Sequence, residues 1–169
     1  MNRFEKSDTE YHFDRITDYT ISQDEIVVVG TKQYLNFYDN HGTFLYSYWM
    51  QGVSGAYTCE YSGEDILIYR VRENDSFLIR PDGSYLSVDS ANHKEKSRLS
   101  QTVNQIEYQL NASLTELTAT DKSGNIRIIY HMSESAQQQD IFLTLLVIVI
   151  AIVCIIKKIF WKKEEKPSA

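Results

Sequence analysis

The sequence predicts an all-β domain of three four-stranded antiparallel repeats, followed by one C-terminal transmembrane helix. Three observations predict this fold class. A long uncharged apolar run lies near the C-terminus, and glycines recur every 41 residues through the rest of the chain. Between the turn sequences lie short segments rich in β-branched and aromatic residues, which favour strands. A small β-sandwich is the alternative fold for the same strands.

The apolar run from Ile141 to Ile156 has no charged residue, and 13 of its 16 positions are Ile, Val, Leu or Phe. Lys157 and Lys158 can extend toward the lipid headgroups, so the apolar stretch continues to Trp161. About 21 residues rising ~1.5 Å each match a hydrocarbon core of ~30 Å. We therefore expect a transmembrane helix over 141–161, a linker over 133–140 and a basic tail over 162–169.

Charge at the two ends of this helix predicts its orientation. Residues 157–169 carry five Lys against two Glu, whereas residues 133–140 carry two acids and no base. The positive-inside rule then predicts a single-pass protein of the cell membrane, with the β domain outside and the C-terminus in the cytoplasm. Residues 1–13 lack the apolar segment of a signal peptide. Either a leader or further repeats precede this sequence, or the protein is tail-anchored with a cytoplasmic domain.

Composition limits the partners. Residues 1–140 carry 12 Lys and Arg against 21 Asp and Glu, a net charge of −9, which excludes nucleic acid as an expected partner. The two cysteines are Cys59 and Cys154, and the second lies in the apolar run, so neither a disulfide framework nor a cysteine metal site is expected. The expected partners are the lipid bilayer, a protein or glycan ligand, and a second copy of the β domain.

Internal repeats organise residues 1–132. Gly42, Gly83 and Gly124 are 41 residues apart, and each ends a four-residue turn, DNHG, RPDG or DKSG. Glycine supplies the positive φ that such tight turns need, so these three are structural turn glycines. The repeats cover about 17–48, 57–88 and 97–130. In the first, strands are expected at 17–22, 26–30, 34–39 and 43–48.

The strand–turn–strand pattern around Phe37-Tyr38-Asp39-Asn40-His41-Gly42 resembles the blades of bacterial NHL- and TolB-type β-propellers. It is also similar to bacterial membrane proteins that combine such repeats with one anchor. The resemblance covers about residues 11–130 and implies blade-like sheets. Closed propellers contain about four to eight blades. Three repeats therefore imply an open or incomplete propeller, or one that a second copy completes.

Recognised catalytic motifs are not present in the sequence, and we assign no catalytic residue, metal ligand or cofactor. Two pairs of acids, Asp24-Glu25 and Glu64-Asp65, occupy equivalent turns of the first two repeats. They are the candidate acids of a glycan-active hydrolase, although exposed turn residues are the simpler interpretation.

Aromatic residues are the remaining candidates for binding. Phe44, Tyr46 and Tyr48 alternate along one strand, as core residues do. We expect Trp49 and Met50, just past this strand, to be exposed, and with Tyr57 they are the candidate binding residues. The sequence thus favours a membrane-anchored, non-enzymatic module for binding, sensing or interaction. A glycan-active hydrolase and a fragment of a larger propeller protein are the alternatives.

Overall fold

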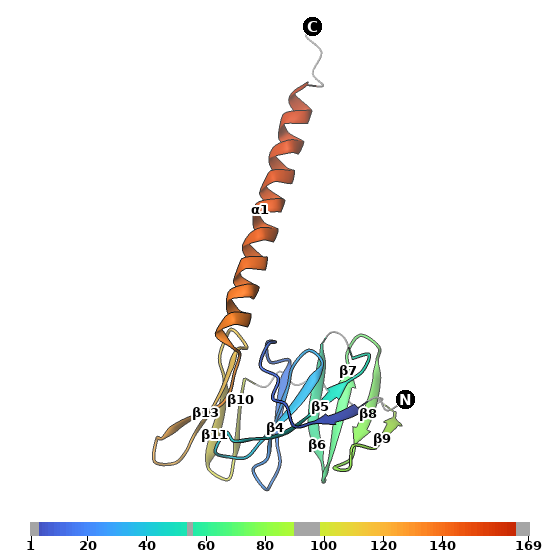
Figure 1. The fold of residues 1–169 in the computed structure, drawn as a ribbon, viewed down its shortest axis with the longest axis vertical. Coiled ribbons are helices and arrows are strands. Elements are labelled where there is room, and N and C mark those ends of the chain that lie inside the picture. The colour runs from blue at the N-terminus through green and yellow to red at the C-terminus, as the bar shows by residue number, and fades with distance from the viewer. Residues whose placement is uncertain (1–3, 54–55, 90–98, 165–169) are drawn as a thin grey trace. The chain divides into compact units, whose positions relative to one another are not determined.

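The computed structural model describes residues 4–53, 56–89 and 99–164, with side chains as far as Lys158. Within these residues the chain forms three antiparallel sheets and one helix, α1 (Glu134–Glu164). Three packed sheets replace the two of the alternative sandwich, so the all-β fold with a C-terminal apolar helix is confirmed (Figure 1). The chain divides after residue 132 into a β unit and a helical unit, which are described separately.

Sheet one has the strand order β1-β5-β4-β3-β2. Its strands are β1 (Phe4–Ser7), β2 (Asp18–Ile21), β3 (Val27–Gly30), β4 (Tyr34–Tyr38) and β5 (Phe44–Met50). The repeat pattern predicted β2 to β5 but not β1. The segment FEKS is too short and too polar to show alternation, and it becomes a strand by pairing with the outer edge of β5. The N-terminal segment thus covers an edge that would otherwise be open.

Sheets two and three each contain four strands in chain order. Sheet two comprises β6 (Tyr57–Ser62), β7 (Asp65–Arg70), β8 (Asp75–Ile79) and β9 (Tyr85–Val88). Sheet three comprises β10 (Ser100–Val103), β11 (Ile106–Leu110), β12 (Glu116–Thr120) and β13 (Ile126–His131). Residues 97 and 98, expected in the third repeat, lie outside the described residues.

The last hairpin of every sheet closes with the same turn. Gly42, Gly83 and Gly124 have φ of 85°, 81° and 82°, and each glycine N–H donates to the carbonyl of the first turn residue. In the third turn the Asp121 carboxylate accepts hydrogen bonds from the Asn125 amide and from the backbone of Ser123 and Asn125. These hydrogen bonds, with that of the Asn125 side chain foremost, hold the pKa of Asp121 below its usual range.

Sheet one lies between the other two sheets (Figure 1). Its inner strand β3 is therefore covered on both faces, and Val27, Val28 and Val29 are fully buried. This arrangement explains the continuous apolar run in the sequence, since a strand with only one buried face would alternate. Chain order would place sheet two in the middle of the stack, but sheet three packs on the far side of sheet one instead.

The contact between sheets one and two is the main apolar core. It buries side chains from both sheets and from β1. The cluster comprises Phe4, Val28, Leu35, Phe37, Tyr48, Met50, Val53, Tyr57, Cys59, Ile66, Ile68, Phe77 and Ile79. The Arg70 side chain is buried near this core, where Nε donates to Asp75 Oδ1 at 2.7 Å and Nη1 to the Gly52 carbonyl at 3.1 Å.

The contact between sheets one and three depends on tyrosines. The Tyr19 hydroxyl donates to the Tyr108 carbonyl at 3.3 Å, and the Tyr130 hydroxyl donates to the Asp14 carbonyl at 2.7 Å. Tyr38 and Tyr130 meet edge to face, with centroids 6.5 Å apart. Burial raises the pKa of the Tyr38 and Tyr130 phenols, so both remain neutral at physiological pH.

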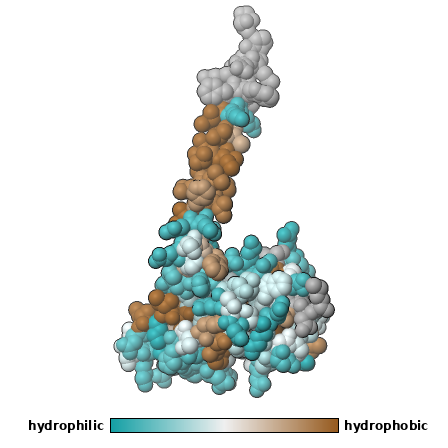
Figure 2. Space-filling view, viewed as in Figure 1, coloured by the Kyte–Doolittle hydropathy of each residue, from teal (hydrophilic) through white to brown (hydrophobic). Residues whose placement is uncertain are grey.

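The helical unit consists of α1. Residues Glu134–Lys158 are long and apolar enough to cross a membrane, and Figure 2 shows the hydrophobic side chains along this helix. The expected linker over 133–140 is wrong from Glu134 onward, because the helix begins there. Ser133 caps it by accepting the Ala136 N–H, and Glu, Ala and Gln are good helix formers. The end of the expected basic tail, 165–169, lies outside the described residues.

Candidate functional site

The first strands of the three repeats, β2, β6 and β10, meet around an open groove of about 900 Å³. We call it the first-strand groove. Strands β2, β6 and β10 contribute its walls together with the turns that follow β2 and β6. Its lining residues are Thr20, Ile21, Ser22, Gln23, Asp24, Ile26, Tyr46, Glu60, Tyr61, Gly63, Glu64, Pro81, Ser100 and Gln101. A groove of this size falls within the range of small-molecule sites.

Two hairpin turns position the acidic part of the groove. After β2, the Ser22 N–H donates to the Ile26 carbonyl at 2.9 Å, and Ser22 Oγ accepts the Ile26 N–H at 2.9 Å. Glu25 has a φ of 63° in this turn, and Gly63 has a φ of 69° in the turn after β6. Both turns thereby present a carboxylate, Asp24 or Glu64, to the groove.

Two tyrosines form the aromatic part of the wall. Tyr46 stacks on Phe37 with centroids 4.3 Å apart, and Lys6 Nζ lies 4.1 Å from the Tyr46 ring centroid. The backbone N–H of Tyr61 donates to Thr20 Oγ1 at 3.4 Å, which ties β6 to β2. Burial raises the pKa of both phenols, so each hydroxyl is a neutral hydrogen-bonding group at physiological pH.

The charged side chains among the described lining residues of the groove are all acidic. Asp24, Glu60 and Glu64 are the ionisable carboxylates on its surface, and none of the described lining residues is Lys or Arg. A small adjoining pocket of about 40 Å³ shares Tyr46, Tyr61 and Glu64 with the groove, and Arg80 lines it. The described lining residues therefore favour a neutral or cationic group over an anion. Within the described part of the chain, no cluster of three or more His, Cys, Asp and Glu side chains has a metal-binding arrangement.

The three candidate binding residues from the sequence do not form this site. Met50 is fully buried because β5 extends through it, so the expectation that it is exposed is wrong. Tyr57 is also buried in the core. The Tyr57 hydroxyl donates to the carbonyls of Thr31 and Tyr34, which joins sheets one and two. Trp49 is half-buried on β5, opposite Glu5 and Tyr34. None of the three lines the groove.

Of each acid pair predicted from the sequence, one member lines the groove and the other does not. Asp24 and Glu64 line the groove, as their equivalent turns suggest, but Glu25 and Asp65 do not. Glu25 accepts hydrogen bonds from the Asn40 and Asn104 amides, the second at 3.1 Å. Sequence reasoning missed Glu60, Ser100 and Gln101. The signal for them is their position on the first strand of a repeat, since first strands face the centre when blades are arranged around an axis.

A scan of family models and a search of curated proteins give no match to this chain. Among solved structures it is similar to "Streptogramin B lyase structure", at 11% identity and a TM-score of 0.38, covering 74% of this chain and 43% of that one. It is similar to virginiamycin B lyase from Staphylococcus aureus, in selenomethionine form, at 11% identity and a TM-score of 0.39, covering 74% and 44%. It is also similar to KlHsv2 with loop 6CD replaced by a Gly-Ser linker, at 13% identity and a TM-score of 0.38, covering 67% and 38%. The chain spans less than half the length of each of these proteins.

Proposed function

We propose that this chain is a membrane-anchored, non-enzymatic recognition module whose first-strand groove binds a neutral glycan. The observation that carries the proposal is the chemistry of the lining. Hydroxyl and amide side chains lie beside two tyrosines, and the charged lining residues among those described are all acids.

Each class of lining residue has a role in such binding. Ser22, Gln23 and Gln101 offer donors and acceptors to sugar hydroxyls, and the carboxylates accept hydrogen bonds from them. Tyr61 offers an apolar ring surface with a polar end. Because the groove is open, it suits an extended chain better than a small enclosed molecule. An anionic ligand would meet three carboxylates and would be repelled.

The hydrolase alternative needs two acids in different environments, one of them shielded from water so that it stays protonated. Asp24 and Glu64 are both exposed, which supports binding over catalysis. Hydrolysis nevertheless remains the second candidate function, because Asp24 and Glu64 line the same groove.

The anchoring part of the proposal rests on α1 and on the charges that flank it. We place the β unit outside the cell and the C-terminus in the cytoplasm, because five lysines follow the apolar run and none occurs within residues 133–140. A glycan of the cell surface or its surroundings would then reach the groove directly.

Isothermal titration of the full chain in detergent tests the glycan proposal. The probes are chitohexaose, cellohexaose and maltohexaose, with heparin as an anionic probe and deca-arginine as a basic peptide. We expect at least one neutral hexasaccharide to bind and heparin not to bind. Gln23→Ala and Tyr61→Phe should each weaken binding by about tenfold, the effect of one or two lost hydrogen bonds. Trp49→Ala, a substitution outside the groove, should not change it.

Three outcomes oppose the proposal. If no neutral probe binds, or if Trp49→Ala weakens binding as much as the groove variants do, the groove is not a glycan site. If only deca-arginine binds, the groove takes a basic peptide. Cleavage of a bound hexasaccharide that Glu64→Gln abolishes would establish the hydrolase instead.

A further inference from the structure

Two exposed isoleucines lie together on the outermost strand of sheet three. Ile126 is 71% exposed and Ile128 is 56% exposed, and both lie on β13, which pairs with β12 at the edge of the sheet. Their side chains are on the face turned away from sheet one, since the opposite face carries the buried Tyr108, Leu117 and Ala119. Figure 2 shows a hydrophobic patch on this side of the β unit.

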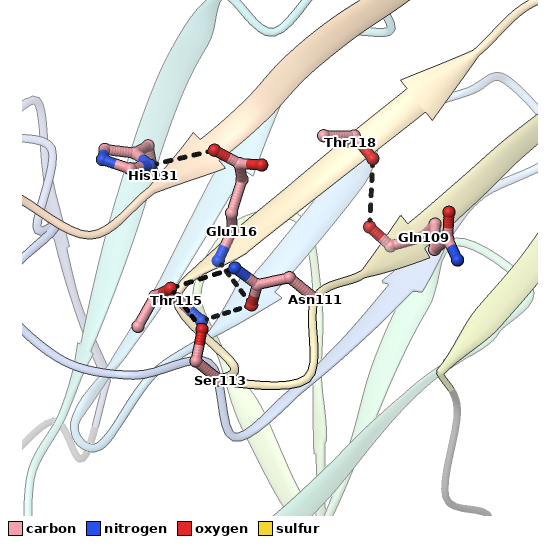
Figure 3. A network of polar contacts seen from close by, with 7 residues as sticks. All are labelled: Gln109, Asn111, Ser113, Thr115, Glu116, Thr118 and His131. Carbon is pink, nitrogen blue, oxygen red and sulfur yellow. Dashed lines mark hydrogen bonds and ion pairs between the residues drawn. The ribbon is translucent and has the colours of Figure 1, made fainter.

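The residues around the two isoleucines on this face are polar, and the nearest of them are threonines. Their cross-strand neighbours are Thr118 and Thr120. Farther along the same face, His131 Nδ1 lies 3.1 Å from Glu116 Oε2, and Thr118 Oγ1 donates to the Gln109 carbonyl at 3.3 Å (Figure 3). Glu107, the cross-strand neighbour of Thr120, and Glu116 are also on this face, so a contact between two copies should centre on the isoleucines and not on the sheet face beside them.

The backbone of β13 is a less suitable contact than its side chains. A Cβ at Gly42 would lie 2.5 Å from the Ile128 carbonyl oxygen, so the turn between β4 and β5 lies directly against that part of the strand. The register of β13 against β12 also shifts between Leu117 and Thr118. Irregularities of this kind discourage the addition of a strand at a sheet edge. Contact with a partner should therefore use the isoleucine side chains.

The small size of this patch decides which partner can occupy it. A stable interface buries about 800 Å² on each partner, far more than two isoleucines provide. A freely diffusing protein would not be retained. A second copy in the same bilayer is held at high effective concentration, so a weak contact suffices. Only Met132 and Ser133 separate β13 from α1, so identical chains carry this patch at the same distance along the chain from their anchors.

We propose that two copies of this chain associate in the membrane by packing Ile126 and Ile128 of one copy against the same residues of the other. The contact is two-fold symmetric, and the apolar patch is its own complement. The strength of this contact depends on the proposed membrane anchoring, whereas the residues that form the contact do not depend on it.

Disulfide trapping in phosphatidylcholine vesicles tests this contact. Ile128→Cys is made in full-length protein that carries Cys154→Ser, and Leu86→Cys, an exposed position on the outer strand β9 of sheet two, is the matched control. We expect Ile128→Cys to form covalent dimers at least about tenfold faster than Leu86→Cys, because only the first cysteine lies in the contact. Dilution into excess detergent should abolish the difference, because it removes the shared bilayer.

Energy transfer between labelled copies provides the second measurement. Ile126→Lys with Ile128→Thr should lower the transfer in vesicles to the level of unpaired chains, while the melting temperature shows that the β unit remains folded. Replacement of residues 141–156 by polyleucine should leave the transfer unchanged. Equal trapping at both cysteines, or a loss of transfer in the polyleucine chain, would overturn the proposal. A chain that does not float with vesicles refutes the anchoring, and the association that depends on it is then refuted as well.

Discussion

The turn glycines differ in what surrounds them, and this difference predicts unequal costs for one substitution. An alanine at φ near +80° costs about 1–2 kcal/mol of unfolding free energy, because its Cβ approaches the backbone. Apart from its two chain neighbours, no described residue comes within 4 Å of a Cβ added at Gly124, so Gly124→Ala should cost this amount alone. At Gly42 the added Cβ would lie 2.5 Å from the Ile128 carbonyl oxygen. Overpacking against backbone adds about 1–3 kcal/mol, so Gly42→Ala should cost about 2–5 kcal/mol.

Urea unfolding of the full chain in detergent measures both costs. Trp49 reports on sheet one if Trp161→Phe removes the second tryptophan. A difference of 1 kcal/mol corresponds to roughly 3–5 °C in Tm for a domain of this size, so a thermal melt should rank the variants in the same order. Equal costs for Gly42→Ala and Gly124→Ala would mean that the turn after β4 does not contact β13. The packing of sheet three on sheet one would then need revision.

Three further substitutions test the core and the turns. Tyr57→Phe removes the donor to the buried Thr31 carbonyl and should cost about 1–3 kcal/mol in urea unfolding; a neutral result would mean that this hydroxyl does not join the sheets. Asp75→Asn weakens the acceptor of the buried Arg70 guanidinium and should cost about 1.5–3 kcal/mol, with Asp65→Asn as the control. Asp121→Asn tests how the stability of the fold depends on pH. The folded pKa of Asp121 lies below its unfolded value of about 3.9, so this carboxylate stabilises the fold above that value and loses its effect as pH falls through the folded pKa. The variant should lose less stability than the parent chain between about pH 5 and pH 3, and parallel curves would contradict the role given to the turn.

Local sequence signals were sufficient for the strands of the repeats, their closing turns and the apolar part of the helix. The glycine spacing identified three equivalent turns because only a positive φ closes them. The run of valines in β3 agrees with a strand that is covered on both faces. The helix start was not predicted, since the polar residues before the apolar run suggested a linker. Their helix propensity and the Ser133 cap decide otherwise.

Contacts distant in sequence account for the other errors. Met50 and Tyr57 look like apolar or aromatic residues near a loop. Met50 is buried because β1 pairs with β5 and sheet two packs against it, and Tyr57, on β6 of sheet two, is buried against sheet one. The groove needs three sheets to be placed together, and its third wall comes from β10, about 40 residues after the second. No local pattern encodes the position of sheet three beside sheet one, because it depends on hydrogen bonds from tyrosine hydroxyls to the carbonyls of Tyr108 and Asp14, which are distant in sequence.

Protease accessibility in intact cells tests the central claim, a recognition domain displayed by a membrane anchor, most directly. The chain carries one epitope tag before residue 1 and another after Ala169, and digestion is followed with and without detergent. We predict that protease removes the β unit from intact cells, while a membrane-bound fragment of α1 keeps its C-terminal tag until detergent is added. A β unit that resists digestion until the cells are lysed would place it in the cytoplasm, and the account of a displayed module would be wrong.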